Sequence, residues 1–496
     1  MTQFTQGHFE FHSLHSRKVT AAFDGGKVSS DGGGLLLREV EQRFRIIQQF
    51  AGCFTDHRDP DRVEHSLIEL LKQRIFGLCL GYEDLNDHDQ LRLDPLMAVL
   101  VDKKDPLGHD RDRKSQGKAL AGKSTLNRLE LTPVRANAGS RYKKIVAHLD
   151  VMQRFFVDAF VQQHLVPPER IVLDIDSTDF VLHGHQLGKF FHGYYDADCY
   201  LPLFIFCGDF PLLALLRPSN IDDCLGVRKH LARIVEQIRR AWPSVEILVR
   251  GDSGFCRDHL MSWCEDNRVD YLFGLAKNKR LLKILAKEMH EAKVLFEQTK
   301  EPSRVYKDFT YKTRKSWRRE RRVVGKAEHL KKGENPRFVV TSIASIASGA
   351  ASEAAQLLSA QRLYERDYCA RGAMENRIKE KKLYLFADRV SCSTMRANQV
   401  RLCMSTVAYI VMRTLRGHGL KETEMSSAQV DTIRVKLLKI GAVIKVSVRR
   451  VVVSLTESCP FQRVFERAWE NLRALLRPLA AEPPLPTAMP PPTLGG

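Results

Sequence analysis

Two short apolar runs in the middle of the chain each stop at an aspartate, and this pattern constrains the fold more than any other feature. Residues 171–176 read IVLDID, and residues 245–254 read VEILVRGDSG. Such β-rich runs are typical of buried strands. In an open α/β sheet, side chains at the carboxyl ends of adjacent strands point into one crevice. The sequence therefore predicts an α/β fold with Asp176 and Asp252 at one edge of a sheet.

A single aspartate after a strand has a simpler explanation, because this residue commonly caps a helix or forms a turn. The first run also offers two acidic candidates, since alternation places Asp174 and Asp176 on the same face of a strand. We prefer Asp176 because it lies nearest the strand end and begins a polar turn. The choice between the two stays open at this point.

The residues around these aspartates predict a definite succession of elements. After the first run come two more β-rich runs, then an amphipathic helix, the second aspartate strand, another helix and a further strand. The segments are residues 171–176, 190–209, 211–220, 226–242, 245–250, 257–268 and 270–278. We expect these seven segments to form the core of one sheet with its covering helices.

A third acidic residue lies in the segment YCARGAMENRIKEKK, whose flanks are typical of a helix. Arg371, Glu375 and Lys382 follow Tyr368 at offsets of 3, 7 and 14 residues. At about 100° per residue, these four side chains fall within roughly 60° of arc on a helix. Such a stripe is often a solvated face with ion pairs. Its order after the two aspartates favours a site instead, with a carboxylate beside groups suited to gripping phosphate.

Asp176, Asp252 and Glu375 are together suited to binding divalent cations. Three carboxylates in one place repel each other and take up protons unless a cation is present. Two Mg²⁺ ions, about 3.5–4 Å apart, would activate a water or hydroxyl and stabilise the leaving oxygen of a phosphoryl displacement. We therefore expect two Mg²⁺ ions per site, with Mn²⁺ able to substitute.

These motifs resemble those of the DDE transposases of bacterial insertion sequences. The shared features are Tyr-x2-Arg-x3-Glu-x6-Lys from Tyr368, Asp-x-Thr from Asp176 and Asp-x-Gly from Asp252, within residues 165–415. The resemblance implies an RNase-H-like catalytic fold with Asp176, Asp252 and Glu375 as catalytic metal ligands. It also implies that Tyr368, Arg371 and Lys382 contact the backbone of the transposon end. Relatives of this type carry a mostly β insertion before the glutamate.

The charge of the chain favours a polyanionic partner. The 496 residues carry a formal net charge of +19, and the calculated pI is about 9.5. Residues 304–337 contain 13 Lys or Arg against 4 Asp or Glu, interleaved with β-branched and aromatic residues. We predict a small basic sheet lying along DNA, with Trp317 and Tyr311 available to stack on an exposed base. The predicted DNA-binding cations include Arg318, Arg319, Arg321 and Arg322. A solvated, disordered basic loop is the alternative.

At this length we expect several domains. Their predicted order is a mostly helical DNA-end-binding domain (1–150), the first part of an RNase-H-like core (151–295), a basic β-rich insertion (296–345), the second part of the core (346–420), a basic C-terminal region (421–481) and a proline-rich disordered tail (482–496). The fold class is therefore α/β with a helical N-terminal addition. The C-terminal region is expected to contain a strand pair with one basic face.

Other patterns narrow the function. Residues 117–124 satisfy a phosphate-loop spacing, but the preceding HDRDRKSQ cannot be the buried strand that such a loop follows. We read GKS as the start of a helix and expect no ATP. The eleven cysteines form no CxxC pair, and no apolar stretch reaches membrane-spanning length. With no signal peptide, we expect action in the bacterial cytoplasm at the nucleoid, and no membrane.

The hypothesis is a DNA transposase that cleaves at terminal inverted repeats and joins the ends to target DNA, by a cut-and-paste route. A homodimer on paired ends is expected, because each end needs an active site. The alternatives are an RNase-H-like nuclease without joining activity and an inactive, domesticated DNA-binding protein.

Overall fold

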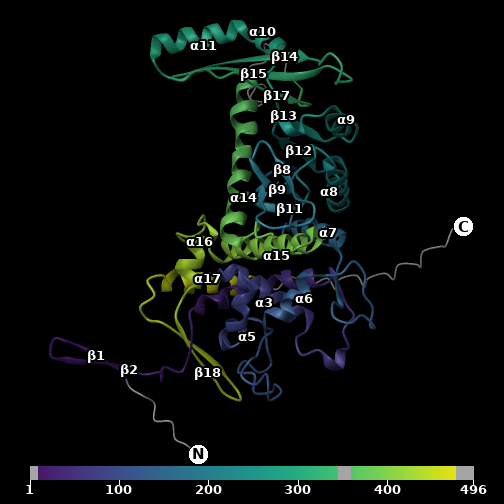
Figure 1. The fold of residues 1–496 in the computed structure, drawn as a ribbon. Coiled ribbons are helices and arrows are strands. Elements are labelled where there is room, and N and C mark those ends of the chain that lie inside the picture. The colour runs from purple at the N-terminus through teal and green to yellow at the C-terminus, as the bar shows by residue number, and fades with distance from the viewer. Residues whose placement is uncertain (1–8, 345–358, 476–496) are drawn as a thin grey trace, which may run out of the picture.

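The computed structural model describes residues 9–344 and 359–475. The predicted proline-rich tail, residues 482–496, lies outside them. Within the described part, no helix is long and apolar enough to cross a membrane. Figure 1 shows a large central sheet with helices on both sides, a helical layer below it, and a β-rich extension above it.

Each of the predicted β-rich segments of the core contributes a strand to the central sheet. Its neighbouring strands run in the order β11 (Phe210–Leu215), β10 (Leu203–Cys207), β6 (Arg170–Ser177), β12 (Glu246–Gly251), β13 (Asp270–Leu275), β17 (Arg337–Thr341), β15 (Arg321–Leu330) and β14 (Ser303–Tyr311), and β16 (Gly333–Glu334) pairs with β15. β12 runs parallel to β6 and β13 parallel to β12, whereas β10 is antiparallel to both β6 and β11. The predicted α/β class is confirmed, and the core elements follow one another in the predicted order, except that residues 190–209 contain two strands of a separate sheet in addition to β10.

Helices cover both faces of this sheet. Figure 1 shows α14 (Gly372–Leu385) on one side of the strands, with α8 (Val227–Ala241) and α9 (Asp258–Asp266) on the other. α7 (Leu149–Gln162) packs on β11 and on α8. The remaining major helix, α15 (Met395–Thr414), crosses beneath α14 and also contacts β11.

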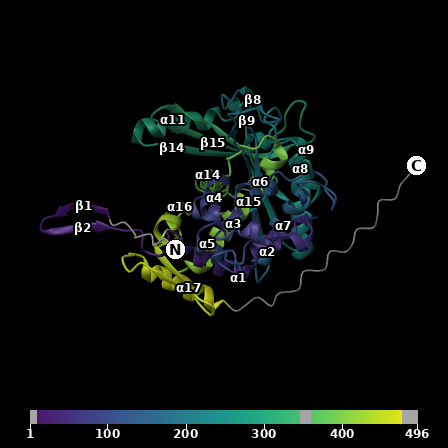
Figure 2. The same cartoon turned by 60° about the horizontal axis from the view of Figure 1, so that its bottom comes forward.

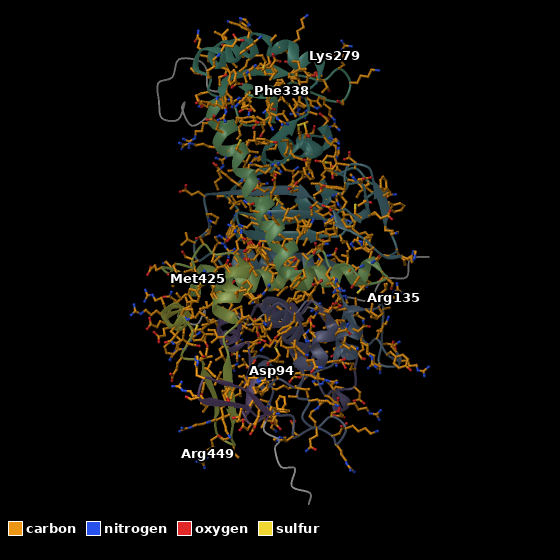
Figure 3. The ribbon with its side chains drawn as sticks, turned by 60° about the vertical axis from the view of Figure 1, so that its left-hand side comes forward. Asp94, Arg135, Lys279, Phe338, Met425 and Arg449 are labelled. Atoms are coloured by element: carbon orange, nitrogen blue, oxygen red, sulfur yellow. The ribbon has the colours of Figure 1, made fainter. Side chains whose placement is uncertain are left out.

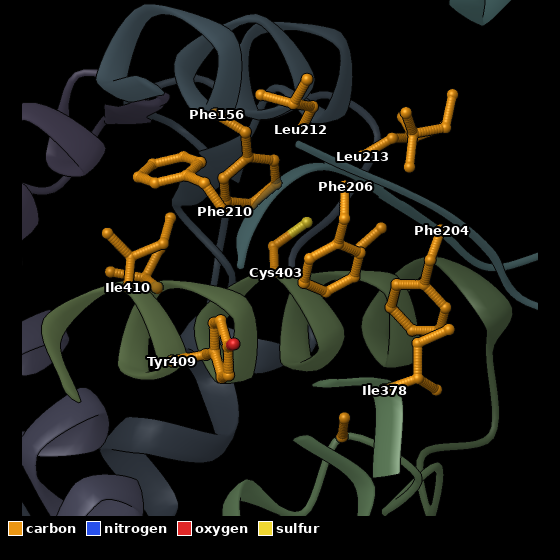
Figure 4. Close-up of a cluster of buried hydrophobic side chains, with 14 of the residues drawn as sticks. Phe156, Phe204, Phe206, Phe210, Leu212, Leu213, Ile378, Cys403, Tyr409 and Ile410 are labelled. Atoms are coloured by element: carbon orange, nitrogen blue, oxygen red, sulfur yellow. The ribbon is translucent and has the colours of Figure 1, made fainter. Parts of the chain in front are cut away.

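Aromatic side chains fill the space between α15 and the sheet edge. In Figure 4, Phe204, Phe206 and Phe210 of β10 and β11 lie beside Tyr409 and other residues of α15. The rings of Phe206 and Tyr409 are 6.2 Å apart, and all four aromatic side chains are buried. Buried aromatic area of this size contributes strongly to stability, so it fixes α15 against the sheet.

The first 150 residues are largely helical, but they have no core of their own. Their helices are α1 (Leu35–Phe44), α2 (Ile46–Ala51), α3 (Leu67–Leu80), α4 (His88–Leu91), α5 (Pro95–Leu100) and α6 (Lys123–Glu130). α3 packs directly on α15, and one cluster of buried residues runs from the N-terminal helices through the sheet to α17 (Gln462–Ala474). The predicted separate N-terminal domain is therefore not confirmed, and its role in end recognition stays a prediction.

Three local features of this region follow from single residues. Arg45 adopts φ +50° between α1 and α2, so these two helices are separate. α3 starts with a capping box in which Ser66 and Glu69 satisfy each other's backbone amides. α6 begins immediately after Gly122, as predicted for the GKS sequence.

Short strands join distant parts of the chain. β4 (Phe54–Asp56) pairs with β5 (Ile145–Ala147), and the C-terminal strands β18 (Ala442–Val446) and β19 (Val451–Leu455) form the predicted antiparallel pair. β18 also pairs with β3 (Lys27–Ser29) of the N-terminal region. The N- and C-terminal regions therefore form one body, from which a hairpin of β1 (Phe9–Leu14) and β2 (Arg17–Ala21) projects (Figure 2).

The predicted insertion is β-rich, but its sheet is not separate. β17 pairs with β13, so the hairpin of β14 and β15 extends the central sheet. α10 (Lys279–Ile284) and α11 (Ala286–Thr299) belong to the same unit, because α11 packs on β14 and β15. α10 and α11 thus lie with the insertion predicted for residues 296–345, and α14 connects this part of the molecule to the layer of α15 (Figure 1).

A second, smaller sheet lies in the chain between β6 and β10. It consists of β7 (Phe180–Val181), β9 (Ala197–Tyr200) and β8 (Phe190–His192), in that order. β7 follows β6 after a turn of two residues, Thr178 and Asp179.

Candidate active site

The strand register places the two predicted aspartates at the same edge of the sheet. Gly251, the last residue of β12, pairs with Ile175 of β6. The next residue of each strand is Asp252 and Asp176, respectively. β6 and β12 are parallel, so both carboxylates emerge at their carboxyl ends, as the sequence predicted.

Asp174 and Asp176 have different surroundings, although both lie on one face of β6. The Asp174 carboxylate is buried and is held by Arg250, with Nε–Oδ1 and Nη2–Oδ2 distances of 2.7 and 2.8 Å. Asp176 makes no such pair of hydrogen bonds to an arginine. Its ion-pair partner is Arg371, at 3.7 Å from Nη1 to Asp176 Oδ2. The structure thus favours Asp176 as the ligand and gives Asp174 a supporting position.

Burial raises the pKa of Asp176 to about 7. The positive charge of Arg371 opposes this rise, whereas Asp252 and Glu375 add to it. The two other predicted carboxylates are therefore near enough to repel Asp176. Negative charge concentrated in this way is what a bound cation relieves.

Asp252 caps the short 3₁₀ turn Ser253–Phe255, and its Oδ1 accepts a hydrogen bond of 2.9 Å from the Gly254 amide. Asp252 therefore caps a helical turn and is also a candidate metal ligand, so the two roles considered for this residue are compatible. Its pKa is raised, first by burial, while the Gly254 hydrogen bond and Arg371 act to lower it and Asp223 acts to raise it.

Asp223 is a residue of this site that the sequence analysis missed. A Cβ on Gly254 would lie 3.0 Å from Asp252 Oδ1 and 3.1 Å from Asp223 Oδ2, so both carboxylates flank the same glycine. The signal lay in β11, which runs parallel to β6 and is followed by the polar sequence that contains Asp223. Side chains that follow the carboxyl ends of neighbouring strands point into one crevice, and this holds for β11 as it does for β6 and β12.

Glu375 lies in the first turn of α14, with an exposed side chain. The segment before it is not the regular α-helix that the sequence predicted: Leu363–Tyr368 is a π-helical turn and Cys369–Arg371 is a 3₁₀ turn. Such departures are common at functional sites. They change the angular offsets in the Tyr-Arg-Glu stripe, but Arg371 Nη2 still reaches Glu375 Oε1, at 3.1 Å.

Arg371 is the residue that connects the three acids. Its guanidinium contacts Asp176 and Glu375, and it interacts electrostatically with Asp252. Burial lowers the pKa of Arg371, but Asp176, Tyr368 and Glu375 outweigh this and raise it. The arginine therefore partly neutralises the cluster.

The acidic residues fit a divalent metal by their chemistry. All are oxygen donors, which Mg²⁺ prefers. In the described part of the chain, however, no three His, Cys, Asp or Glu side chains stand close enough together to hold an ion as they are placed. Arg371 lies between two of the predicted ligands. Metal binding would therefore require the guanidinium to move aside.

Tyr368 and Lys382 lie on two sides of Asp176, Asp252 and Glu375, which together are called the acidic cluster. A Cβ on Gly274 would lie 2.6 Å from the Tyr368 hydroxyl and 3.3 Å from the Asp252 carbonyl carbon, so the phenol lies against the Asp252 turn. Lys382 Nζ donates to the Asp179 carbonyl oxygen at 2.9 Å and lies 3.3 Å from the Asp179 carboxylate. Their predicted contacts with DNA stay predictions.

Three of the residues predicted to bind DNA in the insertion have structural roles. Trp317 is buried edge-on against Tyr311, with ring centroids 5.7 Å apart, so neither ring is available to a base. Arg321 is buried between Asp258 and Glu265, at 2.7 Å from each. Arg322 is buried and pairs with Asp308. Tertiary contacts bury Trp317, Arg321 and Arg322, so the structure gives no support to their predicted contacts with DNA, which stay predictions.

Arg318 and Arg319 are exposed, as a DNA-binding role requires. Each still pairs loosely with a carboxylate of α9: Arg318 with Asp258 at 3.4 Å, and Arg319 with Glu265 at 3.2 Å. Ion pairs this exposed contribute little to stability. Both side chains are therefore available to a stronger anionic partner.

A mixed sheet that gathers acidic residues from three distant segments at its edge is the arrangement of a DDE catalytic domain. The chain belongs to the family described as Transposase DDE domain group 1, whose model matches residues 11–477. Comparison with curated proteins gives no significant match. Among solved structures, a piggyBac transposase synaptic complex with hairpin DNA matches at 13% identity and TM-score 0.40, covering 82% of this chain and 80% of that one.

Proposed function

We propose that this protein is a cut-and-paste DNA transposase with an RNase-H-like core. The observation that carries the proposal is the meeting of Asp176, Asp252 and Glu375 around Arg371, from segments 76 and 123 residues apart. A stability role alone does not account for this arrangement, since repulsion between the acids disfavours their ionised forms. Membership of the transposase family supports the same reading.

Asp176, Asp252 and Glu375 would hold two Mg²⁺ ions, or Mn²⁺ in their place. Such a pair supplies an activated water or hydroxyl and stabilises the leaving oxygen of a phosphodiester. Asp223 lies near enough to Asp252 to add negative charge on that side. Asp174 and Arg250 support the strand beneath.

The basic residues of the site would bind and align the DNA backbone. Arg371 can exchange its carboxylate partners for a phosphate oxygen, because its planar fork suits either anion. Lys382 can do the same from the other side, where Asp179 now holds it. Tyr368 would keep the strand end in register beside Asp252. Each of these residues acts on position, which strongly affects rate.

A second DNA-binding surface is proposed at the outer end of the insertion. Lys277, Lys279 and Lys283 are exposed, and no described carboxylate pairs with them. Arg280 joins this surface to the tip of the β14–β15 hairpin, because its Nη1 donates to the Lys312 carbonyl oxygen at 3.2 Å. Figure 3 shows Lys279 at this extremity of the molecule. The hairpin tip adds the exposed cations Lys312, Arg314, Lys315, Arg318 and Arg319.

Two copies acting on paired ends are part of the proposal, since strand transfer of both ends requires two active sites. The test uses a plasmid that carries the coding sequence's own flanking DNA, purified protein and Mg²⁺. The proposal expects excised fragments and products joined to target DNA. Cleavage without joined products would favour the nuclease alternative, and binding without cleavage would favour the domesticated DNA-binding protein.

The matched variants are Asp176→Asn, Asp252→Asn and Glu375→Gln, each of which should abolish both products. Glu246→Gln is the control, because Glu246 is an exposed acid at the opposite end of β12. Full activity in any of the three site variants would contradict the proposal.

A further inference from the structure

Three aromatic side chains are exposed on the small sheet that follows Asp176 in the chain. Phe190 and Phe191 lie in β8, and Tyr194 lies in the turn that joins β8 to β9; their exposures are 43%, 62% and 85%. Exposed aromatic rings near a site that binds nucleic acid are suited to stacking on bases. None of the catalytic or DNA-binding roles proposed above involves these three rings.

The backbone that carries these rings is firmly held. β9 pairs with both β7 and β8. Ser219 Oγ donates to the Phe190 carbonyl oxygen, and Tyr200 Oη donates to the Leu187 carbonyl oxygen, each at 2.7 Å. The rings are therefore presented by an anchored hairpin.

The hairpin reaches the acidic cluster through Tyr195. The rings of Tyr194 and Tyr195 are 5.0 Å apart, edge to face. Burial raises the pKa of the Tyr195 phenol, and the charges of Asp179, Asp223 and Asp176 raise it further. Tyr195 thus lies between the acids and the exposed Tyr194. The same small sheet also approaches α14, which carries Glu375: Lys382 Nζ of α14 lies 5.7 Å from the ring centre of Phe180 in β7, and β7 pairs with β9.

We propose that Tyr194 and Phe191 form a stacking platform for an unpaired nucleobase of the DNA strand whose phosphate lies at the acidic cluster. This inference rests on the proposed function, because it needs a DNA strand at that place. Every base offers a π-face, so such stacking tolerates any sequence. The platform replaces Trp317 and Tyr311, whose rings are buried.

The position of the platform favours a nucleobase over a protein partner. Other exposed aromatic side chains of the described residues lie elsewhere in the chain, among them Phe9, Phe11, Tyr142 and Trp469. Tyr194 connects, through Tyr195, to the residues proposed to bind the scissile phosphate. A base attached to that phosphate is the nearest aromatic partner available.

The test compares two DNA probes of arbitrary sequence with the full-length protein, in EDTA so that the DNA stays intact. One probe is a blunt duplex, and the other carries a three-nucleotide single-stranded overhang that contains 2-aminopurine. Stacking quenches the fluorescence of this base. Wild-type protein should quench the overhang probe and bind it more tightly than the blunt probe.

Tyr194→Ala and Phe191→Ala should each weaken binding of the overhang probe by at least about fivefold and restore the fluorescence. Tyr194→Phe keeps the ring and should behave as wild type. Tyr142→Ala removes another exposed tyrosine, with an exposure of 61%, elsewhere in the chain and is the matched control. Affinity for the blunt probe should be the same in all variants. Equal melting temperatures would verify that the variants are folded.

Two outcomes would overturn the platform. The first is unchanged quenching and affinity for the overhang probe in both alanine variants. The second is self-association of the wild-type protein that Tyr194→Ala abolishes, which would make the rings an interface with a second copy. The assay needs no turnover, so a protein that stacks the base but never cleaves would disprove the proposed function and leave the platform intact.

Discussion

Asp174 and Arg250 lie side by side on neighbouring parallel strands and form a buried, two-pronged ion pair. Asp174 and Arg250 lie two residues before Asp176 and Asp252, respectively. The ion pair therefore holds together the two strand ends that carry the candidate ligands. Burial raises the pKa of Asp174, and Arg250 counteracts the rise. The carboxylate therefore depends on its partner to remain ionised.

Removing only one member of this pair should be costly. Arg250→Met leaves Asp174 buried without a cation, and we expect the free energy of unfolding to fall by about 3–5 kcal/mol. Urea denaturation measures the change. The double variant with Asp174→Leu removes both charges and should regain most of the loss. A single variant as stable as wild type would contradict the bracing role.

Asp176→Asn should make the protein more stable while removing activity. The folded-state pKa of about 7 exceeds the usual 3.8, so the unfolded chain releases this proton at lower pH. Wild-type stability therefore falls as pH rises from about 4 to 7, and the loss persists above that range. Without metal, the asparagine variant should be more stable by on the order of 2–4 kcal/mol at pH 8, and by nothing at pH 3.5. Denaturation at the two pH values, in EDTA, tests the difference.

Arg371→Ala should misplace the DNA and leave metal binding intact. The loss of one phosphate contact beside Glu375 should slow cleavage on the order of 100-fold. Strand transfer should suffer more, since joining requires two aligned DNA molecules. Calorimetry with Mn²⁺ should give an affinity at least as high as that of wild type, because no guanidinium has to leave Asp176 and Glu375 before the ion binds. Lost metal binding with normal cleavage positions would mean that Arg371 only supports Glu375.

The outer basic surface should contribute affinity and not chemistry. Replacing Lys277, Lys279 and Lys283 by alanine should weaken DNA binding and lower the slope of log affinity against log salt, by roughly one unit per lost phosphate contact. The control replaces Lys331 and Lys332, exposed cations at the other end of the β14–β15 hairpin. If the control substitutions lowered the salt slope by as much per replaced residue, the effect would come from the overall positive charge and not from a defined DNA-binding surface.

Lys381 is fully buried, with Nζ 2.9 Å from Thr406 Oγ1 and 4.6 Å from the Phe204 ring centre. Burial lowers its pKa to about 7. The unfolded chain holds this proton up to about pH 10.5, so this group makes stability rise between pH 7 and 10.5. Lys381→Met should raise stability at pH 7 by on the order of 4 kcal/mol and remove that part of the pH dependence.

The control for this prediction is Lys379→Met, because Lys379 is exposed on the same helix. Equal effects of the two substitutions on the urea midpoint would show that burying the Lys381 amine does not lower the free energy of unfolding.

Local patterns predicted the core well because they reflect local physics. The β-branched run 171–176 and the amphipathic run 226–242 each have one periodicity that fits one element, and both formed as expected. The break at Arg45 and the π-helical turn at Leu363–Tyr368 were not predictable in this way, because packing overrode the helical pattern. The packing of α11 on β14 was not predictable for the same reason: in the sequence α11 reads as an ordinary helix, and only its tertiary contacts join it to the insertion.

By itself, the sequence determined the order of the core elements, the candidate acids and the basic character of the chain, because strand ends, motif spacing and charge are properties of short segments. Tertiary structure alone separated the surroundings of Asp174 and Asp176, added Asp223, and buried Trp317, Arg321 and Arg322 while exposing Tyr194. Those outcomes depend on which side chains meet across distant segments. Arg250 binds Asp174 through two hydrogen bonds, whereas Asp176 has only the longer contact with Arg371, and no local pattern contains those pairings.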